Sequence, residues 1–242
     1  MFRANQVLAS IEKIRPNVTD EPQITKLAQI EAQAYSLRGL FYFYLNNSFN
    51  NGNVPYINEI AEVEEDYYKK VTPSDEIKKY YREDLQKALD LGLNDKWEKT
   101  DLGRITSWAV KAILGKSYLY DKEYNKAAEY FKDIIDNGGF ALVDDIVDNF
   151  TAANEFNSES ILEVSYSTQY NTEFGTWSES TLYNIWGMNV NGLGDAWLNT
   201  VPAFWLVEAF ETEPVDRLDE RNWIKMQSDN YGCLLYTSPS PR

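Results

Sequence analysis

Apolar positions in the first two-thirds of the chain recur with the 3.6-residue period of an α-helix. A first helix is predicted near the start of the chain, where the residues sharing one helical face are Val7, Leu8, Ile11 and Ile14. A second, longer helix is predicted to begin at Thr19–Pro22, where a capping oxygen and a proline suit a first turn, and to end near Asn46. Its expected buried stripe consists of Ala34, Leu37, Phe41, Tyr44 and Leu45.

A third helix is predicted between the start signal at Thr72–Glu76 and the glycine at Leu91–Gly92. Its buried stripe is expected to contain Ile77, Tyr81, Leu85, Ala88 and Leu89. Two further helices, over Thr106–Tyr120 and Glu123–Ile135, are predicted to be joined by a tight turn.

The last two predicted helices fit a tetratricopeptide helix pair. Gly115 and Ala127 supply the small residues that let two helices approach closely, and Phe131 supplies the aromatic side chain that fills the groove beside them. Gly39 and Tyr42 fit the same frame more loosely, with partners on the third helix. Because one such pair cannot bury its apolar face alone, we expect a mainly α fold with stacked tetratricopeptide-like pairs.

After Val164 the helical period fades and aromatic residues become frequent among Ser, Thr, Asn and Gly. This change predicts a helical core over residues 1–165 and a loop-rich aromatic part over residues 166–232. The final segment, 233–242, resembles translated sequencing-adapter text, and we expect it to be a non-native tail. A genuine disordered terminus rich in Ser and Pro is the alternative. The start of the chain has no secretory signal pattern, so the sequence is expected to be a fragment of a longer protein.

The chain has 242 residues, with 23 basic and 38 acidic side chains, no histidine and one cysteine, so its formal net charge is −15. An excess of acidic residues does not suit nucleic acid, and without histidine neither a histidine-dependent triad nor an imidazole metal site can form. The acidic run Glu59–Asp66 is expected to be a solvated surface, because it lacks the spacing of a calcium loop. No apolar stretch approaches the roughly 20 residues of a membrane span, and no cofactor or metal is predicted.

Three segments of the chain resemble the signatures of SusD/RagB-type proteins, in the order and with the spacing typical of that family. They cover roughly residues 20 to 170. The segments are Glu31–Leu45 with Phe49 and Val54–Pro55, then Gly103–Thr106 with the helix up to Tyr120, and finally Asn157–Val164.

The resemblance implies a lipid-anchored outer-membrane protein of Bacteroidota on the extracellular face, which binds glycans or other nutrients for a SusC-type TonB-dependent transporter. Members are about twice as long as this chain, and the lipid-anchor cysteine and signal are absent from it. The resemblance also makes the loop of Asn50, Asn51 and Asn53 a candidate ligand contact. Arg38 and Arg104 are expected to have structural roles, binding carboxylates or helix-end carbonyls.

The aromatic part offers further candidates for ligand binding, because an exposed ring can stack on the apolar face of a sugar while neighbouring amides and hydroxyls bind its hydroxyl groups. The candidate rings are Trp177, Tyr183, Trp186 and Trp197. Packing inside the protein stays open as an alternative for each. Trp97, Trp108 and Trp205 are expected to be packing residues.

The leading hypothesis is therefore a non-catalytic glycan-binding protein. The main alternative is a tetratricopeptide-type adapter that binds only protein, through a concave helical groove. An enzyme is not expected, since glycoside hydrolysis needs two carboxylates about 5 to 10 Å apart across a cleft, and the sequence does not place such a pair.

Overall fold

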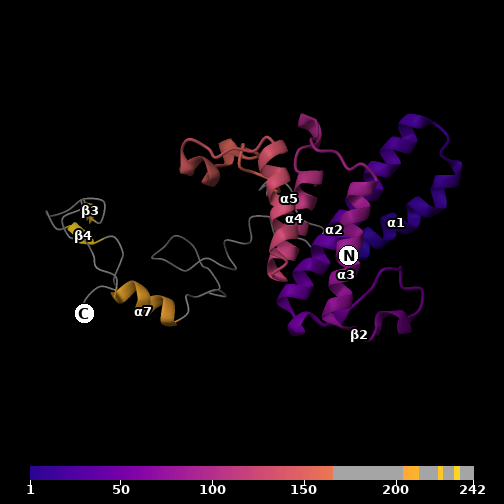
Figure 1. Cartoon of the computed structure of the whole chain (residues 1–242), viewed down its shortest axis with the longest axis horizontal. Helices are drawn as coiled ribbons and strands as arrows, with labels where there is room; N and C mark the ends of the chain where they lie inside the picture. The colour runs from indigo at the N-terminus through magenta and orange to yellow at the C-terminus, as the bar shows by residue number, and fades with distance from the viewer. Residues whose placement is uncertain (166–203, 213–222, 226–231, 235–242) are drawn as a thin grey trace. The chain divides into compact units, whose positions relative to one another are not determined.

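The computed structural model describes residues 1–165, 204–212, 223–225 and 232–234 (Figure 1). Contacts between residues divide the chain into two compact units, Met1–Ser165 and Tyr166–Arg242. The predicted division into residues 1–165, 166–232 and 233–242 stays a prediction.

The first unit is built from α-helices that pack side by side (Figure 1). Its helices are α1 Phe2–Ile14, α2 Glu21–Ser48, α3 Ser74–Asp90, α4 Ser107–Tyr120 and α5 Tyr124–Asn137. Two short strands, β1 Val54–Pro55 and β2 Val71–Thr72, pair antiparallel after α2 and before α3. In the described residues of the second unit, α7 spans Phe204–Thr212, and β3 Trp223–Lys225 pairs antiparallel with β4 Gly232–Leu234. The prediction of a mainly α fold is confirmed.

The helix boundaries follow the local signals in the sequence. Pro22 lies in the first turn of α2 as predicted, although the side chain of Asp20 makes no capping hydrogen bond. Thr106 caps α4, because its hydroxyl accepts a hydrogen bond of 3.2 Å from the backbone N–H of Ala109. Gly92 ends α3 with a φ of +73°, a conformation that favours glycine.

Helices α2 and α3 are in tight contact at Gly39. A Cβ atom at this position would lie 2.8 Å from Cγ of Leu85 and 3.1 Å from the carbonyl oxygen of Tyr81. Leu85 and Tyr81 are buried, as are Ile77 and Ala88 of the predicted stripe. The tetratricopeptide-like pairing proposed for these two helices is therefore confirmed.

Helices α4 and α5 form a second pair, with Gly115 at the contact. A Cβ atom at Gly115 would lie 2.7 Å from Cε1 of Phe131, so the aromatic ring occupies the space that glycine leaves, as predicted. Ala127 is buried in the same pair. The two pairs are joined through α3 and α4, where the hydroxyl groups of Tyr81 and Ser117 form a buried hydrogen bond of 2.6 Å.

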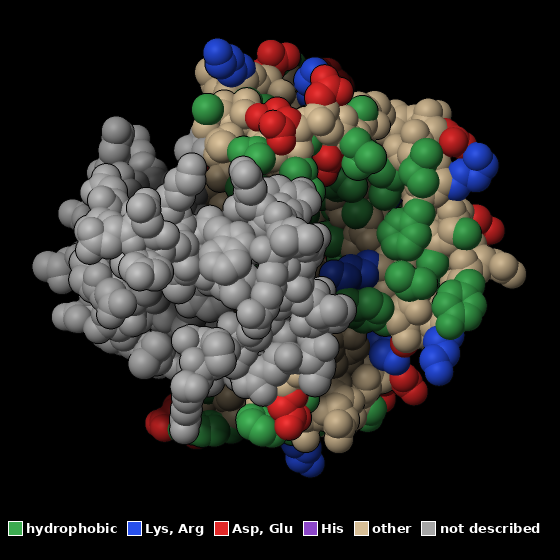
Figure 2. Space-filling model, turned by 90° about the vertical axis from the view of Figure 1, so that its left-hand side faces the viewer, with side chains coloured by type: hydrophobic (Ala, Val, Ile, Leu, Met, Phe, Trp, Pro, Cys, Tyr) green, Lys and Arg blue, Asp and Glu red, His purple; other side chains and the backbone are tan. Residues whose placement is uncertain are grey.

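The predicted buried stripe of α2 is wrong in part. Ala34 is buried and Leu45 is partly buried, but Leu37, Phe41 and Tyr44 are 42%, 47% and 53% exposed. Apolar residues occur on both sides of α2, so their period does not select the side that faces the core. Small residues and the buried hydrogen bonds of the helix select it instead. Hydrophobic side chains are visible among charged ones on the face of the molecule in Figure 2.

The described tryptophans differ in their surroundings. Trp108 is buried, and Trp97 is partly buried and donates through Nε1 to the carbonyl oxygen of Ile105 at 2.9 Å, so both pack as predicted. Trp205 lies in α7, which confirms the predicted helix after Pro202. Its side chain is 68% exposed and not buried as predicted.

Candidate ligand-binding site

The asparagine loop after α2 has a left-handed backbone. Asn50, Asn51 and Gly52 have φ values of +45°, +52° and +85°. Two successive backbone hydrogen bonds close the turn, from Gly52 N to Phe49 O at 2.7 Å and from Asn53 N to Asn50 O at 3.0 Å. Asparagine and glycine tolerate this backbone better than other residues, which explains the local sequence. Such strain is found often at functional sites.

The three predicted asparagines of this loop have different roles. Asn50 and Asn53 each donate a side-chain hydrogen bond to the other's carbonyl oxygen, at 2.9 and 3.0 Å, and Oδ1 of Asn53 accepts one from the backbone of Ser74 at 3.0 Å. These two side chains therefore hold the loop against the start of α3. Asn51 is exposed, and its side-chain amide has no partner among the described residues. Within the described part of the chain, its amide is therefore available for a ligand.

Asn46 fixes the base of the loop, although it is absent from the predicted site residues. It is buried and donates through Nδ2 to the carbonyl oxygen of Gly52 and to Oγ of Ser74, both at 2.9 Å. A Cβ atom at Gly52 would lie 2.7 Å from this Nδ2 atom, so glycine is required there. The signal that could have identified Asn46 is a polar residue on the core side of the last turns of α2.

The four aromatic candidates, Trp177, Tyr183, Trp186 and Trp197, lie outside the described residues. Their predicted contact with ligand stays a prediction.

The second and third signature segments meet around a hollow of about 440 Å³. Arg104 donates to the carboxylate of Asp101 at 2.7 Å, and its guanidinium lies 5.7 Å from the ring centre of Trp97. Glu163 accepts hydrogen bonds from the backbone N–H of Phe156 at 2.8 Å and from the hydroxyl of Ser160 at 2.9 Å. These contacts agree with the structural roles expected for the signature residues.

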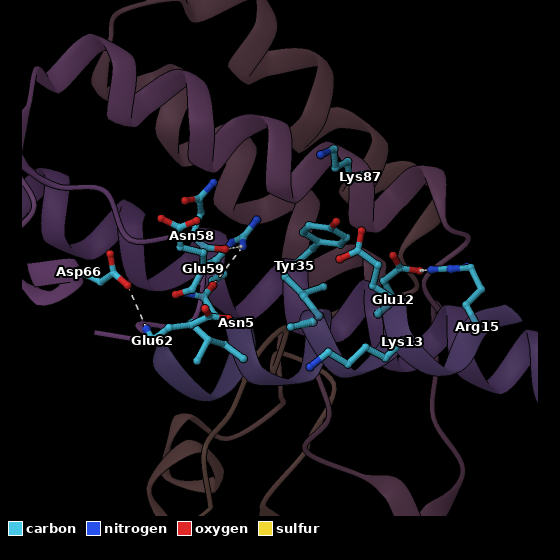
Figure 3. A pocket seen from close by; sticks show the side chains of 15 residues that line it. Asn5, Glu12, Lys13, Arg15, Tyr35, Asn58, Glu59, Glu62, Asp66 and Lys87 are labelled. Atoms are coloured by element: carbon cyan, nitrogen blue, oxygen red, sulfur yellow. Dashed lines mark hydrogen bonds and ion pairs between the residues drawn. The ribbon is translucent and has the colours of Figure 1, made fainter. Parts of the chain in front are cut away.

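A larger, polar pocket of about 800 Å³ lies between α1, α2 and the segment 58–66, and Lys87 of α3 also lines it (Figure 3). In Figure 3 the ring of Tyr35 lies near the middle of the lining, with Asn58 and Glu59 on one side and Glu12 and Arg15 on the other. Arg15, in the turn directly after α1, forms an ion pair with Glu31 of α2. This pocket contains none of the predicted site residues.

Arg38 forms the floor of the polar pocket. Its Nε and Nη2 atoms donate to both carboxylate oxygens of Asp84, at 2.7 and 2.8 Å, and its Nη1 atom donates to Asn5 at 3.1 Å and to the carbonyl oxygen of Asn58 at 3.3 Å. Burial alone would lower the pKa of Arg38, but the hydrogen bond and charge of Asp84 raise it. The expected structural role of Arg38 is therefore confirmed.

The wall formed by the segment 58–66 is held by its own polar contacts. The carboxylate of Asp66 accepts hydrogen bonds from the backbone N–H groups of Glu62 and Val63, at 3.0 and 3.3 Å, and these bonds lower the pKa of Asp66. Lys69 forms an ion pair of 2.7 Å with Glu59. The acidic run is mostly exposed, as predicted, but one side of it also forms the wall of a pocket.

An apolar groove of about 610 Å³ lies between α1 and α2, lined in part by Phe2, Val7 and Ile30. Leu37 and Phe41, which were expected to be buried, also line it. If the protein were instead an adapter that binds only protein, this groove would be its binding surface.

Stacked helix pairs that meet at small residues define a helical-repeat protein of the tetratricopeptide-like class. Residues 1–119 match a SusD-like family model described as "Starch-binding associating with outer membrane". Together with the relatives below, this match shows that the chain belongs to the SusD/RagB family. Its members are carbohydrate-binding proteins and not enzymes, which agrees with the prediction of a non-catalytic protein.

Curated relatives carry the same family name. The chain is 25% identical over 245 residues to a SusD-like protein of Bacteroides ovatus, covering 96% of this chain and 42% of the relative. It is 26% identical over 174 residues to SusD-like protein P25 of Formosa agariphila, covering 72% of this chain and 32% of the relative. The chain thus spans less than half the length of the curated relatives it matches.

Solved structures have the same fold. A laminarin binding SusD-like protein is 31% identical, with a TM-score of 0.64 over 73% of this chain and 38% of that chain. A crystal structure with xylogluco-oligosaccharide has a TM-score of 0.65 over 87% of this chain and 42% of that chain, but at 23% identity it shows the fold alone.

Within the described part of the chain, no helix combines the length and apolar character needed to cross a membrane. The same residues contain no group of three or more His, Cys, Asp or Glu side chains placed to hold a metal ion.

Proposed function

We propose that the protein to which this chain belongs binds a glycan at the outer-membrane surface and does not cleave it. The observation that carries the proposal is the 31% identity to a laminarin binding SusD-like protein over 73% of this chain. The description of the matching family model, starch-binding and associated with the outer membrane, supports it.

The location and partner belong to the same proposal. The protein is exposed on the extracellular face, held there by a lipid anchor, and passes oligosaccharide to a SusC-type TonB-dependent transporter. The family's association with the outer membrane supports this arrangement. Co-purification of the full-length protein with the transporter encoded beside it would test the partnership, and failure to co-purify in detergent would count against it.

The proposed ligand contacts are the rings of Trp177, Tyr183, Trp186 and Trp197 together with the asparagine loop. Within the loop, the exposed amide of Asn51 contacts the sugar, while Asn50 and Asn53 keep the loop in its left-handed conformation. A sugar unit can stack on a ring and hydrogen-bond to a nearby amide at the same time.

The test is calorimetry of the 242-residue chain against a panel that contains laminarin, starch and xyloglucan oligosaccharides. Binding to one of them, with no release of reducing sugar on long incubation, supports a non-catalytic binder. Absence of binding to every glycan of the panel contradicts the proposal for this chain.

Two matched variants of the loop would test the assignment of roles. Asn51→Gly should weaken glycan binding and leave the thermal midpoint nearly unchanged, because the side chain of Asn51 makes no hydrogen bond within the described residues and glycine tolerates the left-handed backbone at this position. Asn53→Ala should lower the midpoint, because it removes the hydrogen bonds to Asn50 and Ser74. Equal effects of both variants on the midpoint would contradict the division of roles.

A second candidate function is a protein-only adapter, which the apolar groove between α1 and α2 favours. Under that alternative Phe41→Ser would abolish capture of the partner, and Trp177→Ala with Trp186→Ala would change nothing. Glycan binding that depends on the two tryptophans would decide against it.

A further inference from the structure

Six polar groups on the wall of the polar pocket have no hydrogen-bond or ion-pair partner among the described residues. They are the carboxylates of Glu12 and Glu62, the ammonium groups of Lys13 and Lys87, the side-chain amide of Asn58 and the hydroxyl of Tyr35. All belong to the first unit, at positions separate from the asparagine loop. Groups of this kind can form hydrogen bonds to a ligand without first breaking bonds within the protein.

Contacts within the protein hold part of the pocket lining in place. Below it, the buried Arg38–Asp84 pair also binds Asn5, and Asn5 in turn donates to the carbonyl oxygens of Ile57 and Glu59 at 2.9 and 3.3 Å. The guanidinium of Arg38 and the ammonium of Lys87 each lie 5.3 Å from the ring centre of Tyr35. These contacts fix the ring and one wall, so a ligand would meet a preorganised surface.

The chemistry of the lining selects the class of ligand. Five carboxylates and four basic groups line the pocket, so the two signs of charge nearly balance. A phosphate or sulfate would lie beside unpaired carboxylates, and an apolar molecule would remove charged groups from water without replacing their hydrogen bonds. A hydroxyl group both donates and accepts, so it can bind a carboxylate and an ammonium group in turn. The volume of about 800 Å³ lies within the range of about 300 to 1,000 Å³ that small-molecule sites occupy.

We propose that the polar pocket is a saccharide subsite that takes a neutral, hydroxyl-rich sugar unit through Glu12, Glu62 and Lys87. The inference rests on the proposed glycan-binding function and adds a contact region on α1, α2 and the segment 58–66. Arg38 and Asn5 are positioning residues, because they hold the walls and do not need to touch the sugar.

The experiment measures affinity of the 242-residue chain for laminarin, starch and xyloglucan oligosaccharides in wild type and four variants. Glu12→Ala, Glu62→Ala and Lys87→Ala remove unpaired groups of the pocket. Glu65→Ala is the matched control, because Glu65 lies on the same segment as Glu62 and does not line the pocket. Each pocket variant should weaken binding about tenfold, as expected for the loss of a hydrogen bond to a charged group, and the control should bind as wild type does. Circular dichroism and the thermal midpoint should not change in Glu12→Ala, Glu62→Ala or Glu65→Ala. Lys87→Ala also loses the contact with the ring of Tyr35, so its midpoint should fall slightly.

A second measurement locates the ligand without mutation. Amide hydrogen exchange should slow over residues 58–66 when the oligosaccharide that binds is added at saturating concentration, and should not change at Glu129 on the exposed side of α5. If the pocket variants bind as wild type does and exchange over 58–66 is unaffected, the subsite is disproved. Loss of binding in Trp177→Ala and Trp186→Ala in the same series would then leave the proposed function intact.

Two further outcomes would also overturn the inference. If wild type binds none of the oligosaccharides, the proposed function and the subsite that rests on it both fail. If a sulfated glycan binds more tightly than its neutral counterpart and Glu62→Ala strengthens that binding, the pocket takes an anion and the neutral ligand class is wrong.

Discussion

The two helix pairs of the first unit meet in the same way but are held together by different contacts. Each pair has a glycine at a tight contact, Gly39 in α2 and Gly115 in α4. Between α2 and α3 the side chains of the Arg38–Asp84 ion pair are only 8% and 4% exposed. Between α4 and α5 the side chains of the Lys111–Asp133 pair are 24% and 39% exposed.

The difference shows how one packing motif can serve two purposes. Because Arg38 is removed from water, all its donors need partners, and it also binds Asn5 and the carbonyl oxygen of Asn58. Helix α1 and the segment 58–66 therefore depend on the first pair, and so does the polar pocket between them. Water can satisfy Lys111, so the second pair needs no such network. The first pair organises the polar pocket, and the second mainly completes the core.

The largest effect is expected from Arg38→Ala. The substitution leaves the carboxylate of Asp84 buried without a cation. Removing one partner of a buried ion pair lowers the unfolding free energy by about 3 to 5 kcal/mol, and we expect a loss of that size here. Chemical denaturation followed by circular dichroism measures the loss. The double variant Arg38→Met with Asp84→Leu removes both charges and should recover most of it. A loss below about 1 kcal/mol in the single variant would disprove the dependence of the fold on this pair.

The next largest effect separates the two glycines. At Gly39 a new methyl group would meet the backbone oxygen of Tyr81, which cannot move away, so Gly39→Ala should destabilise by about 1 to 3 kcal/mol. At Gly115 the methyl group would meet the ring of Phe131, which is partly exposed and can shift. Helix propensity favours alanine over glycine by up to about 1 kcal/mol and offsets part of that strain.

Thermal midpoints of Gly39→Ala and Gly115→Ala test whether the substitution at Gly39 is the more destabilising of the two. Glu129→Ala is a suitable control, because Glu129 is exposed on α5 and its side chain makes no hydrogen bond or ion pair with any described residue. An equal decrease of the midpoint in Gly39→Ala and Gly115→Ala would mean that the backbone of Tyr81 and the ring of Phe131 are equally rigid.

The same comparison explains what the sequence could predict. Glycine, alanine and aromatic residues at helical spacing predicted both helix pairs, because close packing of two helices requires small residues at the contact and a large ring beside them. The partner of Arg38 could not be identified, because Asp84 is 46 positions away and is one of many acidic residues. The exposure of Leu37 and Phe41 could not be predicted either, since α2 is apolar on both sides and tertiary contacts choose between them.

The asparagine loop is a candidate through the family resemblance, and its left-handed turn is not among the sequence predictions. Consecutive asparagines before a glycine tolerate such a turn, and the loop has one. The polar pocket combines residues from α1, α2, α3 and the segment 58–66, each of which is unremarkable in its own stretch of sequence. Its existence depends on how the segments pack, which a single sequence does not state.

A smaller effect is expected from Lys111→Ala. Both side chains of this pair are partly in water, so solvent screens their attraction, and exposed ion pairs contribute little to stability. The denaturation midpoint should move much less than in Arg38→Ala. A shift comparable to that of Arg38→Ala would remove the contrast between the two pairs.

The smallest effect is the acid dependence of the second pair. The hydrogen bond from Lys111 and then that from Asn137 lower the pKa of Asp133 below its ordinary value. A carboxylate whose pKa is lower in the folded state adds stability above its ordinary pKa, near 4, and that stability is lost as the pH falls through the folded value. Unfolding free energy should therefore decline below about pH 4 in wild type, and slightly less in Lys111→Ala, where the pKa of Asp133 is closer to ordinary. Denaturation between pH 3 and 6 measures the difference between the two proteins, and an identical decline in both would mean that Lys111 does not influence Asp133.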